Sequence, residues 1–305
     1  MHGHNPPMTQ DRHGPWAIFQ MVVRPHILAI AGMASLVFGW LFSQQFHPLF
    51  PLLAAGDWFV VNLLNRAVDL PEDARNGVPG TAFLSRHGGA VTAGSFAFLL
   101  GILWLGHLWL PQVTLIRVLF HAVGLAYNYR VIPRRGGRTR FKEMYALKNT
   151  SSALLFVLSV ILLPLVATGA SANPVMVERA AWLTVFFFPL ELTYEVLYDL
   201  RDVDGDRQEN IPTFPVAHGE PWAWRFCHLA IALSFVAPVL GFLVGPLRVR
   251  DAVLSIGAIQ QALVFLYVRR KGPTGPRVVN VTYLGALQLA SYCAWIALGL
   301  PVFGA

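Results

Sequence analysis

The sequence is poor in charge and in cysteine. Only 13% of its 305 residues are charged, whereas a soluble chain carries roughly a quarter. Because 55% of the residues are apolar and the mean hydropathy is +0.52, a disordered chain is excluded, and a mostly apolar surface argues against nucleic-acid binding. Cys227 and Cys293 lie far apart in apolar runs, so they indicate neither a disulfide framework nor a metal-binding knuckle. Long apolar runs are abundant instead, which indicates a protein that crosses a membrane several times.

These apolar runs recur along almost the whole chain. A bilayer core needs about 20 apolar residues per helix, and nine runs approach that length: 26–46, 48–65, 91–111, 113–129, 149–169, 176–198, 223–246, 251–269 and 279–301. We therefore expect an all-α, polytopic membrane bundle of about nine transmembrane helices. Residues 26–301 would form one transmembrane domain, preceded by a polar segment, 1–25, and followed by a short tail, 302–305. Within the first segment, Trp16 to Val23 could lie at the membrane interface as a short helix.

The basic residues predict the orientation of this bundle. All but four of the 23 Lys and Arg residues lie in the amino-terminal segment or in the second, fourth, sixth and eighth connections; the exceptions are Arg117, Arg179, Arg248 and Arg250. The positive-inside rule places the amino terminus and the even connections in the cytoplasm. We expect an integral, multi-pass protein of the cell (inner) membrane.

The few aspartates are unevenly distributed. Six of the nine gather in two clusters, Asp69 and Asp73, then Asp199, Asp202, Asp204 and Asp206. Both clusters lie where an apolar span meets a cytoplasmic connection. Helical spacing predicts two stripes: Asn62, Asn65, Asp69 and Asp73 on one, and Asp199, Asp202 and Asp206 on the other. Asp204 would point away, and Gly205 could end the second helix before Asp206.

Two carboxylate stripes at the same depth repel each other unless a cation lies between them. Mg²⁺ is the natural candidate, because it binds one or two carboxylates and completes its shell with water and phosphate oxygens. The intervening cytoplasmic loop supplies bases that suit phosphate oxygens: Arg130, Arg134, Arg135, Arg138, Arg140, Lys142 and Lys148. The pattern indicates a diphosphate bridged by metal ions.

Each cluster also has a simpler interpretation. An acid at the end of a span is often only a solvated helix terminus. Most arginines between 130 and 140 could anchor lipid head groups and set the topology. Lys148 stands at the start of a span and is therefore a better candidate for a substrate contact.

The two aspartate clusters resemble the motifs of a known family. The run Asn65-Arg-Ala-Val-Asp69-Leu-Pro-Glu-Asp73 resembles the first Asn-x-x-x-Asp-x-x-x-Asp motif of the UbiA-type intramembrane prenyltransferases. The stretch Tyr198-Asp-Leu-Arg-Asp202-Val-Asp-Gly-Asp206-Arg resembles their second motif. The segment from Arg140 to Asn149 is similar to the basic stretch before the family's fifth helix, and Tyr127-Asn128 also fits. The resemblance spans nearly the whole chain.

This resemblance implies a helix bundle around a central cavity, with the Asp-rich motifs at its cytoplasmic side. It implies that Mg²⁺ and an isoprenyl diphosphate are held by Asn65, Asp69, Asp73, Asp199, Asp202 and Asp206. Lys142 and Lys148 would contact the diphosphate, with Tyr127 near the reacting carbon. The candidate catalytic residues are then Asp69, Asp73, Asp199, Asp202, Lys148 and Tyr127. The candidate substrate contacts are Asn62, Asn65, Arg66, Arg138, Lys142, Lys148, Asn149, Tyr194, Glu195, Tyr198 and Arg201.

The sequence departs from the family pattern at two places. Arg66 stands where an acid is common, and Val78-Pro79-Gly80 stands where an Arg-Pro pair is usual. These departures leave the fold intact and the identity of the acceptor open.

Several residues lie deeper in the predicted spans. Glu191 and Glu195 extend the stripe of Asp199 into the membrane, and Asp57 lies in the second span. Acids at such depth are functional candidates by default. Glu195 could orient the acceptor or take its proton, or could equally be a hydrogen-bonded structural acid, which is the preferred interpretation for Asp57. Tyr194 and Tyr198 could stabilise a cation through their rings, although core packing is the simpler role.

The predicted function is Mg²⁺-dependent transfer of an isoprenyl group from an allylic diphosphate to a lipophilic or aromatic acceptor. An alternative is a UbiA-like terpene cyclase that uses the same site without an acceptor. A different class is an ion-coupled transporter, but transporter acids tend to lie near the midplane, and here they lie at the cytoplasmic edge. The sequence encodes neither the prenyl chain length nor the oligomeric state.

Overall fold

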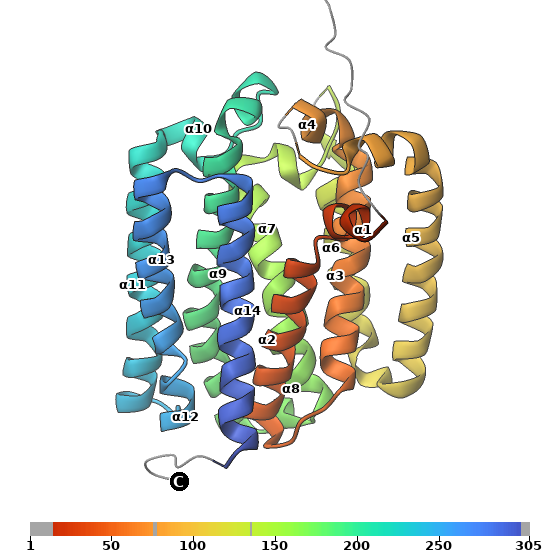
Figure 1. Cartoon of the computed structure of the whole chain (residues 1–305). Coiled ribbons are helices and arrows are strands. Elements are labelled where there is room, and N and C mark those ends of the chain that lie inside the picture. Colours follow the sequence, from red (N-terminus) through yellow and green to blue (C-terminus); the bar gives the residue numbers. More distant parts are fainter. Residues whose placement is uncertain (1–14, 76–77, 135, 300–305) are drawn as a thin grey trace, which may run out of the picture.

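The computed structural model of the chain describes residues 15–75, 78–134 and 136–299 as a bundle of helices (Figure 1). The long helices are α2 (Pro25–Ser43), α3 (Leu49–Val68), α5 (Thr81–Trp109), α6 (Thr114–Asn128), α7 (Tyr145–Val157), α9 (Pro174–Gln208), α11 (Glu220–Val244), α13 (Ser255–Lys271) and α14 (Gly275–Ala297). Shorter helices are α1 (Pro15–Val23), α4 (Leu70–Arg75), α8 (Leu163–Ala167), α10 (Phe214–His218) and α12 (Val249–Ala252). A π-helical segment, Leu158–Leu162, joins α7 to α8.

Short elements cover one end of the bundle, at the top of Figure 1. There lie α4, α10 and an antiparallel hairpin of β1 (Ile132–Arg134) and β2 (Gly137–Thr139). The hairpin lies within the basic connection between α6 and α7, where no strand was predicted from the sequence. Gly136 and Gly137 close it with φ of 91° and 150°, values that residues with a Cβ rarely adopt.

The predicted spans correspond to helices throughout. In the described part of the chain, six helical segments are long and apolar enough to cross a membrane: Pro25–Ser43, Thr81–Trp109, Tyr145–Ala167, Pro174–Gln208, Glu220–Val244 and Val249–Lys271. The predicted spans 48–65, 113–129 and 279–301 coincide with α3, α6 and α14. These three lie outside that set; α3 carries several polar residues and α6 has only 15 residues. The membrane bundle is confirmed, and the count of nine transmembrane helices stays a prediction.

Some boundaries differ from the expected ones. Helix α5 begins at Thr81, ten residues before the predicted span, and α9 runs through Gly205 to Gln208. The expectation that Gly205 ends this helix is therefore wrong, and Asp206 stays on the stripe of Asp199. Conversely, α3 ends at Val68 with Asp69 at its C-cap, so Asp73 belongs to the separate helix α4. The expected helix near Trp16–Val23 is present as α1, whereas residues 1–14 and the tail 302–305 lie outside the described residues.

Helix packing explains why one helix is almost wholly exposed. Helix α5 stands at the edge of the bundle, beside α3 (Figure 1). Its buried residues are small or lie on one stripe, whereas Leu100 and Trp104 are exposed by 69% and 64%. In a membrane these side chains face lipid, which solvates apolar groups as well as a protein core does. The main core lies among α2, α3, α6, α7, α9, α11, α13 and α14.

Two ion pairs are buried away from the Asp-rich motifs. Arg117 donates to both carboxylate oxygens of Asp57, at 2.9 and 2.6 Å, and His121 lies 3.0 Å from the same carboxylate. Arg179 binds Asp251 in the same bidentate way, at 2.9 and 2.6 Å. All four charged side chains are at most 2% exposed. Both carboxylate oxygens of Asp57 are therefore bound by Arg117, which supports the interpretation of Asp57 as a structural acid.

This burial predicts the effect of removing one charge. Asp57→Asn leaves Arg117 buried without a counter-ion, so we expect a loss of about 3–5 kcal/mol of stability, measured by denaturant unfolding in detergent. The double variant Asp57→Leu/Arg117→Met should recover most of this loss. Asp204→Asn, which changes an acid whose side chain is 88% exposed, is the control and should change stability little. An Asp57→Asn protein as stable as the wild type would contradict this account.

Candidate active site

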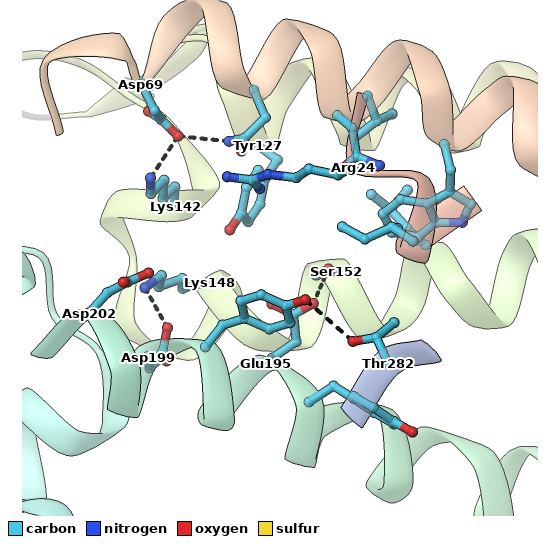
Figure 2. A pocket seen from close by; sticks show the side chains of 18 of the residues that line it. Arg24, Asp69, Tyr127, Lys142, Lys148, Ser152, Glu195, Asp199, Asp202 and Thr282 are labelled. Atoms are coloured by element: carbon cyan, nitrogen blue, oxygen red, sulfur yellow. Dashed lines mark hydrogen bonds and ion pairs between the residues drawn. The ribbon is translucent and has the colours of Figure 1, made fainter. Parts of the chain in front are cut away.

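A cavity of about 140 Å³ lies among α2, α3, α6, α7, α9 and α14, near the end of the bundle that α4 covers (Figure 2). Both aspartate clusters contribute to its wall. The predicted site residues that line it are Asn62, Asn65, Asp69, Asp73, Tyr127, Lys142, Lys148, Tyr194, Glu195, Tyr198, Asp199, Arg201, Asp202 and Asp206. Residues from four separate parts of the sequence thus meet at one site.

The first cluster centres on Asp69, where α3 ends. Its carboxylate accepts from Asn65 Nδ2 at 2.7 Å, from Arg140 Nη1 at 2.6 Å and from Lys142 Nζ at 2.6 Å. Burial disfavours the charged carboxylate, but the Lys142 ammonium and the Arg140 guanidinium outweigh that effect and hold the pKa of Asp69 below its usual value. Asp69 is therefore an anion that draws two cations from the basic connection into the site.

Lys142 is shared between two acids. Its ammonium also donates to both carboxylate oxygens of Glu72, each at 2.8 Å. Glu72 lines the cavity, yet the sequence motif gave it no role because it lies at a variable position of the run. In the sequence, the only feature that points to Glu72 as a site residue is its position between Asp69 and Asp73, three residues after Asp69.

Asp73 is held by the unusual arginine of the first motif. Arg66 Nη1 donates to Asp73 Oδ2 at 2.5 Å, and Arg66 Nη2 donates to the carbonyl of Pro79. The guanidinium is completely buried and does not line the cavity. The two places where the sequence departs from the family pattern are therefore in contact, because Arg66 binds the carbonyl of Pro79 in the segment Val78-Pro79-Gly80. Gly80 makes the turn in this segment, with φ of 88°.

The second cluster lies on α9, opposite the first. Asp199 accepts from Lys148 Nζ at 2.7 Å and from Asn149 Nδ2 at 2.8 Å, and Asp206 lies 3.5 Å from the same ammonium. Asp202 pairs with the neighbouring guanidinium of Arg201. Asp204 is exposed and does not line this cavity, as its helical position predicts.

Tyrosines and a glutamate form the wall below the acids. Glu195 accepts from Ser152 Oγ at 2.7 Å, so α7 and α9 are joined inside the cavity (Figure 2). The hydroxyl of Tyr198 lies 3.3 Å from Thr282 on α14, and the guanidinium of Arg201 lies over the Tyr198 ring, 4.9 Å from its centroid. Tyr194 and Tyr198 both line the cavity and pack against the core.

Not every predicted contact reaches the cavity. Arg138 lies on β2, where the backbone pairs it with Pro133, and its side chain is exposed. Asn149 touches Asp199 but does not line the cavity, and Arg66 lies behind Asp73. From the same basic connection between α6 and α7, Arg140 and Lys142 bind Asp69 instead.

Arg24 is a cavity residue that the sequence analysis did not predict. This residue joins α1 to α2 in a left-handed conformation, with φ of 53° and ψ of 59°. Its side chain extends into the cavity, and its guanidinium lies 3.8 Å from Asp73 (Figure 2). In the sequence Arg24 is one of many bases that set orientation. The only local signal was Pro25, which begins α2 and fixes the chain direction at that point.

The donor set suits a hard cation. In the described ranges, no three His, Cys, Asp or Glu side chains already converge as a metal-binding group. Mg²⁺ does not need such a cage, because it binds through one or two carboxylates, water and phosphate. Carboxylates on α9 and at the end of α3 face one cavity, whose wall also includes the side-chain amide of Asn65. Oxygen donors without soft ligands fit Mg²⁺ better than a transition metal.

Comparisons with known proteins agree with this fold. The sequence pattern of the UbiA prenyltransferase family matches residues 139–284. The structure of a UbiA homologue from Archaeoglobus fulgidus bound to DMAPP and Mg²⁺ is similar with a TM-score of 0.67 and 15% sequence identity, over 93% of this chain and 99% of that one. A UbiA homologue from Aeropyrum pernix gives a TM-score of 0.62 and 16% identity, over 90% and 98%.

One curated relative is similar in sequence over a short stretch. It is a digeranylgeranylglyceryl phosphate synthase from Methanopyrus kandleri, 41% identical over 61 residues. The match spans 20% of this chain and only 22% of that protein. The described chain thus has the UbiA fold, and the resemblance to the UbiA prenyltransferase family that the two motifs predicted is confirmed.

The environment of Asp69 predicts a pH dependence of stability. Because its pKa is lowered in the folded protein, Asp69 contributes stability above its ordinary pKa of about 3.9, and this contribution is lost as the pH falls through the lower, folded value. The difference in unfolding free energy between wild type and Asp69→Asn should be largest at neutral pH and shrink below about pH 4. Unfolding in metal-free detergent solution from pH 7 downward measures it. Asp204→Asn should show no such trend, and a difference that grows in acid would contradict the assignment.

Proposed function

We propose that this protein is a Mg²⁺-dependent intramembrane prenyltransferase that moves an isoprenyl group from an allylic diphosphate to a lipophilic or aromatic acceptor. One observation carries the proposal. Asp69 bound to Lys142, and Asp199 bound to Lys148, face each other across a single cavity that Asp202 also lines (Figure 2). Paired acids and bases at one end of a cavity that also has apolar side chains such as Ile30 and Leu155 in its wall suit a diphosphate with a hydrocarbon tail.

In this proposal the metal ligands come from both motifs: Asn65, Asp69, Asp73, Asp199, Asp202 and Asp206. Bound Mg²⁺ would supply Lewis-acid stabilisation of the diphosphate leaving group. Asp73 is also bound by Arg66, which donates to its Oδ2 at 2.5 Å. This pair positions α4 against the end of α3.

The bases would bind the phosphate oxygens that the metal leaves exposed. Lys148 lies between Asp199 and Asp206, and a lysine ammonium has three donors, so it can bind a phosphate oxygen while keeping an acid contact. Lys142 can do the same from the opposite wall while it remains bound to Glu72. Arg24 extends toward them from the start of α2. These cations are preorganised where negative charge develops as the carbon–oxygen bond breaks.

The carbon end of the substrate would lie deeper, among apolar and aromatic side chains. Ile27, Ile30, Val61 and Leu155 line that part of the cavity. They would exclude water, which would otherwise capture the allylic cation. The ring faces of Tyr127 and Tyr198, which also line it, could stabilise that cation.

The comparisons with solved structures support the proposed class of substrate. Two solved structures of a UbiA homologue from Archaeoglobus fulgidus, which have the same fold, are described as bound to DMAPP or to GPP together with Mg²⁺. Their sequence identities of 15% and 16% support a common fold. The proposed membrane orientation, with the amino terminus and the acid-rich end in the cytoplasm of an inner membrane, rests on the basic connections.

A direct test measures diphosphate release by purified protein given a prenyl diphosphate, with a membrane lipid extract as the source of acceptor. We expect release to require Mg²⁺, to stop on chelation, and to fall by about 100-fold or more in Asp69→Ala and Asp202→Ala, because ground-state and transition-state contacts are both lost. Asp204→Ala, a matched change on the exposed side of α9, should retain activity.

The outcomes separate the competing functions. Release that survives Asp69→Ala and Asp202→Ala would overturn the enzyme proposal. Cyclic hydrocarbon or alcohol formed without any acceptor would identify a terpene cyclase instead of a transferase. A prenylated lipid found by mass spectrometry, present only with active protein, would identify the acceptor.

Glu195 is the proposed base for the acceptor. It is fixed by Ser152 beside the diphosphate site, deeper than Asp199 by one turn of α9. If it takes the acceptor proton, Glu195→Gln should lower kcat at least tenfold and flatten the acid limb of the pH profile, with the affinity for the prenyl diphosphate unchanged. Unchanged turnover in Glu195→Gln would leave Glu195 with a structural role only.

A further inference from the structure

A second and larger cavity adjoins the candidate active site. It measures about 750 Å³ and lies where the start of α2, the end of α9 and the start of α14 meet. Four residues line both this cavity and the site of about 140 Å³: Arg24, Tyr198, Arg201 and Asp202. Asp69 and Asp199, which bind the two lysines of the site, line only the smaller cavity. The diphosphate site therefore shares one wall with a space that has other residues around it.

The wall of the larger cavity is polar on one side and apolar on the other. The polar side includes Arg24, His26, Arg201, Asp202, Asp204 and Asn280. His26 is only 6% exposed, and its Nε2 has no hydrogen-bond partner among the described residues. Met21, Pro276 and Val279 form the apolar side. A hydrocarbon chain alone would shield the polar groups from water without giving them partners, so the cavity suits an amphiphile with a polar head group.

The unused polar groups of this wall are mainly hydrogen-bond donors. Within the described ranges the side chain of Arg24 makes no hydrogen bond, and it lies 3.8 Å from Asp73. Arg201 uses Nε and Nη2 to bind Asp202, which leaves Nη1 without a partner among the described residues. Of the two acids in the wall, Asp202 is thus paired, and the side chain of Asp204 is 88% exposed. Guanidinium groups are suited to carboxylate and phosphate, so an acidic head group is complementary to this wall.

The shared wall also places the larger cavity next to the proposed base. Glu195 lies three residues before Tyr198 on α9, so the two side chains are neighbours on one face of the helix. Both line the smaller cavity, and Tyr198 also lines the larger one. A ligand that enters from the larger cavity along Tyr198 therefore approaches Glu195. Arg24 and Arg201 belong to both cavities, and their positive charge reduces the repulsion between an acidic head group and the diphosphate.

We propose that the larger cavity binds the acceptor, and that the acceptor is an amphiphile whose acidic head group, a carboxylate or a phosphate, is held by Arg24 and Arg201. This inference rests on the proposed function, because it needs a prenyl diphosphate in the smaller cavity. It adds the binding site and the chemical class of the second substrate. The apolar part of the acceptor packs against Met21, Pro276 and Val279.

The test measures binding of dodecyl phosphate to purified protein that is already saturated with geranyl thiodiphosphate and Mg²⁺, so that the diphosphate site is filled. Each dissociation constant is divided by that of the wild type, so that partition of the probe into detergent micelles cancels. Val279→Trp fills the larger cavity and should weaken binding of dodecyl phosphate at least tenfold, with the affinity for geranyl thiodiphosphate changed less than twofold. Val244→Trp, the same change at a 76% exposed site on α11, should alter neither affinity.

A second variant tests the charge of the head group. Asn280→Glu adds a carboxylate to the wall of the larger cavity at an exposed position of α14. Because like charges repel, it should weaken binding of dodecyl phosphate at least tenfold and binding of 1-dodecanol less than twofold. Gln45→Glu, a matched change at an exposed residue beyond the other end of α2, should alter neither. Inorganic phosphate at the concentration of the probe should not displace it, because it lacks the apolar part.

The outcomes separate this inference from the proposed function. Weaker binding of geranyl thiodiphosphate to Val279→Trp would show that the donor tail occupies the larger cavity, and would overturn the inference. It also fails if Asn280→Glu acts alike on dodecyl phosphate and 1-dodecanol, or if inorganic phosphate displaces the probe. Asn280→Glu decides alone if Val279→Trp does not fold. All these results leave the proposed function standing, whereas a wild type that does not bind geranyl thiodiphosphate with Mg²⁺ would overturn that function itself.

Discussion

Burial of carboxylates is the constraint on which the site depends. A carboxylate taken out of water is costly unless a cation and hydrogen bonds compensate it. Asp69 meets this requirement through Arg140 and Lys142, and Asp199 through Lys148. Each of these ion pairs joins two segments that are far apart in the sequence. The same charges therefore fix the end of the bundle and create a place where a metal-bound diphosphate can replace the protein's own contacts.

Replacement of a carboxylate contact by a phosphate contact is consistent with lysine, rather than arginine, standing at the two aspartate clusters. The chain has three lysines among its 23 basic residues, and two of them, Lys142 and Lys148, stand at the two aspartate clusters. A lysine ammonium is a compact charge on a flexible stem, so it can move from a carboxylate to a phosphate oxygen. Arginine serves where the geometry is fixed. Arg66 and Arg117 are completely buried or nearly so, and each binds one aspartate in its own part of the bundle.

Much of this arrangement could be predicted from the sequence. The spacing of the acids near Asp69 and Asp199 predicted two clusters at the same end of the bundle, because this feature follows from local periodicity and hydropathy, and residues of both clusters line one cavity. The resemblance of the motifs gave Lys142, Lys148 and Tyr127 as cavity residues. The predictions that were wrong concerned features that tertiary contacts determine. The continuation of α9 past Gly205 and the hairpin that turns Arg138 outward depend on packing that local propensity does not encode.

The cavity lining shows the same limit. Arg24 lines the cavity only because the chain turns sharply between α1 and α2. Trp58 lines it only because α3, α6 and α7 meet there. Among dozens of apolar residues, nothing in the sequence distinguishes Trp58 from Trp104. Fixed contacts distinguish them in the structure, where one indole is hydrogen-bonded inside the bundle and the other lies on the exposed face of α5.

The central claim is that the two aspartate clusters act together on one metal-bound diphosphate. Crystals grown with Mn²⁺ and geranyl thiodiphosphate test it most directly, because anomalous scattering locates the metal independently of the protein coordinates. The account predicts metal peaks between Asp69 and the Asp199–Asp202 face of α9, bridged by the diphosphate, with Lys148 bound to a phosphate oxygen. Metal and diphosphate bound elsewhere, with Asp69 and Asp199 still paired only with their lysines, would contradict it.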